Sequence, residues 1–61
     1  MWNVIWVTAE ADKVEKALKK LHGLGILTKR RTFFDDERCF FEILVPSAET
    51  GLALDALVEL E

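Results

Sequence analysis

Cysteine, histidine and proline each occur once in this chain of 61 residues. One cysteine, Cys39, cannot form an intrachain disulfide, and with a single histidine, His22, it cannot complete a zinc site of Cys and His ligands. Domains this small are usually stabilised by disulfides, by a bound metal or by a partner. Because an intrachain disulfide and such a zinc site are both excluded, the composition favours association with another chain.

A long apolar run is missing too. No stretch approaches the ~18 apolar residues that a membrane-spanning helix needs. The first residues also lack the charged and apolar segments of a signal peptide. A lone thiol in a chain without a signal is typical of the reducing cytoplasm, which is the predicted location, and no membrane partner is expected.

Basic residues are absent after Arg38. All eight Lys and Arg lie between Lys13 and Arg38, whereas residues 39–61 hold five acidic side chains. The surface should therefore have a basic and an acidic part, which is either ordinary solvated surface or a means of orienting a partner or a second subunit. The net charge of −3 disfavours nucleic acid as that partner.

The chain does contain clear strand and helix patterns. Residues 1–8 are mostly aromatic or β-branched and predict a strand. The set that faces the helices stays open: Trp2, Val4 and Trp6, or Ile5 and Val7. Thr8 predicts the N-cap of a helix over residues 9–22. The apolar stripe of this helix is Val14, Ala17, Leu18 and Leu21.

Two further strands and a second helix follow. Residues 26–34 and 38–45 predict a hairpin with a polar turn at residues 35–37, and the basic middle of its first strand suits a sheet edge. Pro46 ends the hairpin, and Ser47 predicts the cap of the last helix. The apolar stripe of that helix is Leu52, Ala53, Ala56, Leu57 and Leu60.

The order β-α-β-β-α predicts a single α+β domain over residues 1–61. A right-handed crossover leaves a gap between parallel strands 1 and 2 that strand 3 fills. The expected fold is a two-layer sandwich with a three-stranded mixed sheet, order 1-3-2, and two helices on one face; it is ferredoxin-like but lacks the fourth strand. Cys39, Phe41, Ile43 and Val45 should face the helices. The expected buried core is Val14, Leu18, Leu21, Phe41, Ile43 and Leu57.

Several of these positions also carry a family resemblance. They are Trp2 and Trp6 in the first strand, Val14, Ala17 and Leu21 before Gly25-Ile26, the run Glu42-Ile43-Leu44-Val45-Pro46, and the pair Ala53 and Leu57. On them the chain resembles a small bacterial family described as signal-transducing proteins, of unknown biochemical function and with a PII-like, ferredoxin-type fold. Leu24 stands where that family commonly has a glutamate. The resemblance implies the fold and a signalling role, but no catalytic residues.

A reactive constellation cannot be assembled from this sequence. The carboxylates of residues 35–37 lack the spacing of a calcium loop and predict a solvated turn. Cys39 is expected to be a small buried hydrophobe, and His22 a surface residue at a helix end. A glycine-rich phosphate loop and a matched nucleophile and base are both missing. We therefore predict a protein that is not an enzyme and has no cofactor and no metal.

The predicted function is a protein-interaction or regulatory module whose partner the sequence does not identify. The alternative is an RNA-binding module that stacks bases on Trp2, Trp6 and Phe40 beside the basic run Lys29-Arg30-Arg31. Residues 38–42 lack the glycine-containing pattern of RNA-recognition motifs, and Glu42 adds an acid to the surface. Interaction with protein is therefore favoured.

Association is predicted through the first strand. Residues 1–8 contain no charged side chain and no proline, so the strand edge is unguarded. We expect a two-fold homodimer formed by edge pairing or by packing of sheet faces; alternatively, the edge receives a strand from a different protein. The expected interface is Trp2, Val4, Ile5, Trp6 and Phe40, together with Leu54 and Val58 on the side of the last helix away from its stripe.

Overall fold

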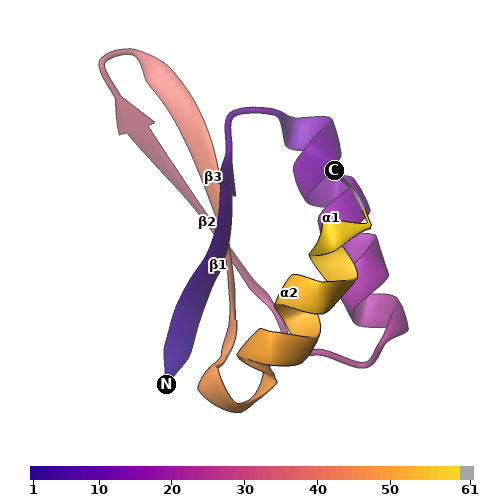
Figure 1. Cartoon of the computed structure of the whole chain (residues 1–61). Helices are drawn as coiled ribbons and strands as arrows, with labels where there is room; N and C mark the ends of the chain where they lie inside the picture. The colour runs from indigo at the N-terminus through magenta and orange to yellow at the C-terminus, as the bar shows by residue number, and fades with distance from the viewer. Residues whose placement is uncertain (60–61) are drawn as a thin grey trace.

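The structure is a computed structural model that describes residues 1–59 of the chain. Within them the elements are β1 (Trp2–Thr8), α1 (Ala11–Gly23), β2 (Lys29–Asp35), β3 (Arg38–Pro46), a 3-10 helix η1 (Ser47–Glu49) and α2 (Thr50–Val58). Strand β3 lies between β1 and β2, antiparallel to both. Both helices cover the same face of the sheet (Figure 1). The predicted α+β fold, ferredoxin-like without its fourth strand, and the strand order 1-3-2 are confirmed. The sheet is antiparallel throughout and not mixed, because β3 separates β1 from β2.

The hydrophobic core lies between the sheet and the two helices. Its central residues are Val14, Ala17 and Leu21 of α1, Ile43 and Val45 of β3, and Ala53, Ala56 and Leu57 of α2. Four of the predicted core positions are therefore confirmed as buried, namely Val14, Leu21, Ile43 and Leu57. Leu18 and Phe41 pack against this cluster but are only partly buried. The ring of Phe41 is instead approached by the Arg30 guanidinium, 5.6 Å from the ring centroid.

The stripe predicted for α2 is wrong at Leu52, whose side chain is 66% exposed. The other described members of the stripe, Ala53, Ala56 and Leu57, are buried as predicted, so only Leu52, in the first turn of α2 after η1, lies outside it. Leu54 and Val58 are exposed, as predicted. Leu60 lies outside the described residues.

The two predicted N-caps, Thr8 and Ser47, are wrong, since each side chain makes a hydrogen bond elsewhere. Thr8 Oγ1 accepts a hydrogen bond from the Glu10 N–H (3.2 Å), and Glu10 is the N-cap of α1. The Ser47 N–H and hydroxyl both donate to the carbonyl of Met1, at 2.8 and 3.0 Å. Ser47 therefore ties the start of β1 to the end of β3 instead of capping α2.

The connection between α1 and β2 is longer than predicted. Gly25 has a φ of 75°, a left-handed conformation that glycine adopts without strain. The next residue, Ile26, donates its N–H to the carbonyl of Leu21 (3.1 Å) and is 5% exposed. Residues 26–28 thus close the end of the core, and β2 begins at Lys29.

A bulge in β1 decides which of its side chains face the helices. Val4 pairs with Leu44 on the side of the sheet away from the core, and Trp2 shares that side. The register then shifts by one residue at Ile5, so that both Ile5 and Trp6 pack against the core. Both sets predicted for this strand assumed strict alternation, which the bulge breaks.

The β2–β3 hairpin turns on two residues in the left-handed region. Asp36 has a φ of 50° and Glu37 a φ of 69°, between the paired residues Asp35 and Arg38. Positive φ at both central residues is the type I′ geometry, which matches the twist of the flanking strands. Glycine fits this geometry without strain, whereas a glutamate there costs about 1 kcal/mol.

Replacing Glu37 with glycine is therefore expected to stabilise the protein by about 1 kcal/mol, which raises Tm by roughly 4–8 °C in a domain of this size. Thermal unfolding followed by circular dichroism measures the change. Glu37→Gln is the matched control, because it removes the charge but keeps the strained side chain. An equal rise in both variants would assign the effect to charge and contradict the backbone explanation.

Candidate interaction surface

The face of the sheet opposite the helices is uncovered by any described part of the chain (Figure 1). Along β3, Ile43 and Val45 point into the core, so Leu44 between them lies on the opposite face. Cross-strand pairing extends this face to both neighbouring strands. Its apolar side chains are Trp2, Val4, Val7, Phe33, Phe40 and Leu44. We refer to it as the open face.

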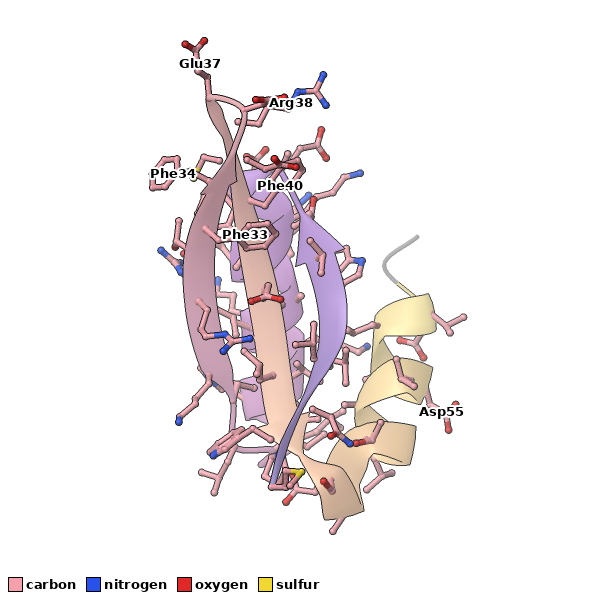
Figure 2. All side chains as sticks on the ribbon, turned by 90° about the vertical axis from the view of Figure 1, so that its left-hand side faces the viewer. Phe33, Phe34, Glu37, Arg38, Phe40 and Asp55 are labelled. Atoms are coloured by element: carbon pink, nitrogen blue, oxygen red, sulfur yellow. The ribbon has the colours of Figure 1, made fainter. Side chains whose placement is uncertain are left out.

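Much of the apolar surface of the open face is in contact with water. Trp2, Val4 and Val7 of β1 are 37 to 46% exposed, and Phe33 of β2 is 38% exposed. The rings of Phe33 and Phe40 stack, with centroids 5.3 Å apart and planes at 21°, near the hairpin tip (Figure 2). Contiguous exposed apolar patches of this kind mark interaction sites on soluble proteins.

Leu44 is only 5% exposed although it lies on the open face. Its cross-strand neighbours are Val4 and Lys29. The Lys29 ammonium lies 4.9 Å from the centroid of the Trp2 ring, so this side chain reaches across β3 from one edge of the sheet to the other. The aliphatic part of Lys29 and the indole of Trp2 together cover Leu44. The cation–π contact therefore lies above a buried apolar side chain.

An ion pair divides the open face at its middle. Arg31 and Glu42 are cross-strand partners, and Arg31 Nη2 and Nε lie 3.0 and 3.1 Å from Glu42 Oε1. The glutamate side chain is 19% exposed and the arginine 58%. The pair separates the Phe33–Phe40 stack from the Trp2 end of the face.

The two ends of the open face differ in charge. The hairpin tip carries the carboxylates of Asp35, Asp36 and Glu37 beside one base, Arg38, and Figure 2 shows Glu37 and Arg38 above the aromatic stack. The other end carries Lys29. Within residues 1–59, neither Lys29 nor the three carboxylates of the tip belong to an ion pair. One end is therefore acidic and the other basic.

The structure brings together only part of the predicted interface. Trp2, Val4 and Phe40 lie on the open face, whereas Ile5 and Trp6 pack against the core. The exposed pair of Leu54 and Val58 lies on α2, in the helix layer. These two therefore do not extend the open face.

Three members of the open face, Val7, Phe33 and Leu44, are absent from the predicted interface. Phe33 could have been found only with a two-residue turn, because the predicted turn at residues 35–37 would pair Phe40 with Thr32 instead. Val7 could not, since its place depends on the bulge at Ile5. The same bulge bears on the edge of β1 predicted to be unguarded, because bulges twist an edge strand and disfavour regular pairing along it.

Only part of the surface that the RNA-binding alternative requires lies on one face of the sheet. Trp2 and Phe40 share the open face, but Trp6 does not. Arg30 points to the helix side, where its Nη1 lies 2.7 Å from a carboxylate oxygen of α1. Glu42 stands in the middle of the surface on which bases would stack.

Within the described residues, the side chains considered for chemistry in the sequence do not assemble into a reactive site. His22 Nε2 is 2.8 Å from Thr28 Oγ1, and Cys39 is partly buried in the hairpin. A hydrogen bond to Glu10 raises the pKa of the exposed Lys13 ammonium. Residues 1–59 form no pocket and no cluster of three metal-ligating side chains. Neither helix in this part of the chain is long and apolar enough to cross a membrane.

Comparison with known proteins adds no relative. Searches with the chain found no matching family model, curated protein or solved structure. The resemblance to the bacterial signal-transducing family therefore stays a prediction that rests on the positions given above.

Proposed function

We propose that this chain is a non-enzymatic protein-interaction module of the cytoplasm, with a regulatory or signal-transducing role, and that it docks partners on its open face. The observation that carries the proposal is the uncovered apolar side of the sheet, where Trp2, Val4, Val7 and Phe33 stay in contact with water. Burying apolar surface contributes about 25 cal/mol per Å². A partner that covers this face therefore gains free energy that the single chain leaves unused.

The first partner is a second copy of the chain, and the contact is between sheet faces. The bulge at Ile5 disfavours regular pairing along the β1 edge. A strand of seven residues is about 24 Å long, and a three-stranded sheet is about 14 Å wide. Two such faces have a flat area of about 670 Å² together, which is below the ~1,200 Å² of stable interfaces and in the range of weak ones. The dimer should accordingly have a dissociation constant in the micromolar range.

Val4→Lys should disrupt the dimer, because it places a charge among the apolar side chains of the open face. We expect the dissociation constant to rise by roughly 100-fold, as for a hot-spot position. Val58→Lys is the matched control, since it makes the same change at an exposed valine of α2 and should leave the constant unchanged. Light scattering across a range of micromolar concentrations measures all three proteins.

Three results would count against the proposal. A wild-type chain that stays monomeric at high micromolar concentration would remove the homodimer. Loss of the dimer in Val58→Lys but not in Val4→Lys would move the contact to the helix layer. A saturable, salt-dependent change in tryptophan fluorescence on adding single-stranded RNA would favour the nucleic-acid alternative.

A further inference from the structure

The outer edge of β2 is a second surface with the features of a contact between copies of this chain. β2 is an edge strand, because the strand order is β1-β3-β2, and all seven of its residues are exposed. We infer that two copies pair antiparallel along this edge, with a two-fold axis at Thr32, and so form a continuous six-stranded sheet. The line along which the two β2 strands meet is called the seam. It does not involve the open face and is independent of the function proposed above.

The edge of β2 is regular along its whole length. Its pairing with β3 has no bulge, unlike the pairing of β1. Asp35 and Arg38 flank the two-residue turn, so their backbone N–H and C=O groups face each other across the hairpin. Since these groups alternate in direction along a strand, those of Arg30, Thr32 and Phe34 point outward, away from β3. A second strand can therefore pair with all three residues.

The sequence of β2 is complementary to itself when two copies run in opposite directions. It reads Lys-Arg-Arg-Thr-Phe-Phe-Asp, with its bases in the first half and its aromatic and acidic residues in the second. An axis at Thr32 places every base opposite an aromatic or acidic residue of the other copy, and the two threonines opposite each other, which is a favourable cross-strand pair. The pairs across the seam are Lys29 with Asp35, Arg30 with Phe34, Arg31 with Phe33, and Thr32 with Thr32.

The charges at the two ends of β2 meet opposite charges in this register. Within residues 1–59, Lys29 and Asp35 belong to no ion pair, so both are available to the other copy. To reach the carboxylate, the Lys29 ammonium leaves its exposed position 4.9 Å from the centroid of the Trp2 ring. One such ion pair forms at each end of the seam. Opposite charges at both ends fix the orientation and the register of the two strands.

The two arginines of β2 do not repel a second copy. Lysine and arginine on an edge strand commonly discourage further pairing. Here Arg30 Nη1 lies 2.7 Å from Glu15 Oε1, and Arg31 Nη2 lies 3.0 Å from Glu42 Oε1, so each guanidinium is directed to α1 or β3 of its own protomer. The two Arg31 side chains are diagonal neighbours across the seam, but each is neutralised by its own glutamate. Their aliphatic parts, not their charges, lie beside the seam.

A shift of the axis by one residue in either direction weakens the contact. An axis at Arg31 sets the two Arg31 side chains directly opposite each other, and an axis at Phe33 leaves Lys29 opposite no residue of the partner strand. Either shift also leaves two residues at one end of each β2 without a cross-strand partner. The axis at Thr32 is therefore the one that pairs the whole strand and its charges.

The experiment is cross-linking of the full chain with a short bismaleimide, in protein that carries Cys39→Ser to remove the native thiol. Thr32→Cys places the two thiols on the axis, with Cβ atoms about 5 Å apart, so most of the associated chains should link. Phe34→Cys is the matched control. Phe34 lies on the same side of β2 and is 76% exposed, but its two copies are about 14 Å apart along the seam and should not link. Two strands meet over about 5 Å of width, against about 14 Å for the open face, so linking is followed up to millimolar protein.

A charge exchange in the Thr32→Cys protein tests the register. Lys29→Asp or Asp35→Lys sets like charges opposite each other at both ends of the seam. Each should raise the dissociation constant roughly three- to tenfold and lower the linked fraction accordingly. The two changes together restore opposite charges, so the double variant should link as well as the Thr32→Cys parent. A double variant that links no better than the single ones contradicts the pairing of Lys29 with Asp35.

The outcomes are distinct from those of the proposed function. Linking at Thr32→Cys but not at Phe34→Cys supports pairing along the edge of β2. Equal linking at both positions, or linking at neither, overturns the inference. Thr32 lies on the helix side of the sheet, so a dimer formed through the open face keeps its two copies apart. A failure to link therefore leaves the open-face contact standing.

Discussion

Replacing Leu21 with alanine is expected to unfold most of the protein at 25 °C. Leu21 is fully buried between the two helices and the sheet, in contact with the central cluster. Removing such a side chain leaves a cavity and costs about 3–5 kcal/mol. A domain of this size has only about 3–5 kcal/mol of stability in total, so the loss equals or exceeds what is available. Urea unfolding followed by circular dichroism should show a midpoint near zero denaturant.

The matched control for this change is Leu52→Ala. The sequence pattern assigns Leu52 to the core stripe of α2, but its side chain is 66% exposed. The same chemical change should therefore cost less than about 0.5 kcal/mol, as at other surface sites. Equal losses in the two variants would show that α2 is rotated relative to the structure described here, and would restore the stripe that the sequence predicts.

The strand order of the sheet and the placing of both helices on one face could be predicted, because they follow from the order of the elements and the lengths of the connections. A strand, a helix and a second strand imply a right-handed crossover, and the short turn after β2 forces β3 into the gap. Strong periodicity at Val14, Ala17 and Leu21 then identifies the inner side of α1, and all three are buried.

The errors in the prediction arise where a single residue changes which side of a strand or helix the following side chains face. The bulge at Ile5 reverses the alternation of β1. The 3-10 turn η1 precedes α2, and there the error is confined to Leu52 at the start of the helix. Neither Ser47 nor Ile5 is unusual for the element that the sequence predicts. What decides these positions is tertiary, such as the bonds from Ser47 to the carbonyl of Met1, and a single sequence does not display them.

The candidate surface was predictable to the same extent. Trp2, Val4 and Phe40 could be named because they are apolar residues on strands that have water on one side. Trp6 was assigned to the same surface by its spacing from Trp2, which is valid only in a regular strand. The charge difference along the open face could not be predicted, because it depends on the register that places Lys29 beside Leu44.

Because of the bulge, we expect alanine substitutions at the two tryptophans of β1 to lower the stability of the protein by very different amounts. Trp6→Ala should cost about 2–4 kcal/mol, because Trp6 packs against the core. Trp2→Ala should cost less than about 1 kcal/mol in the monomer, since the indole lies on the open face and covers mainly Leu44 and Lys29. In a regular strand both side chains would share one face and the two losses would be similar.

Urea unfolding measures both losses, and it should be done at a protein concentration below the dissociation constant of the proposed dimer. Under that condition association does not add to the apparent stability. At high concentration Trp2→Ala should additionally weaken the dimer, whereas Trp6→Ala should weaken folding but not the contact itself. A larger loss of monomer stability from Trp2→Ala than from Trp6→Ala would contradict the bulge. It would also assign Trp6 to the open face, and with it the docking surface proposed for this protein would have a different set of residues.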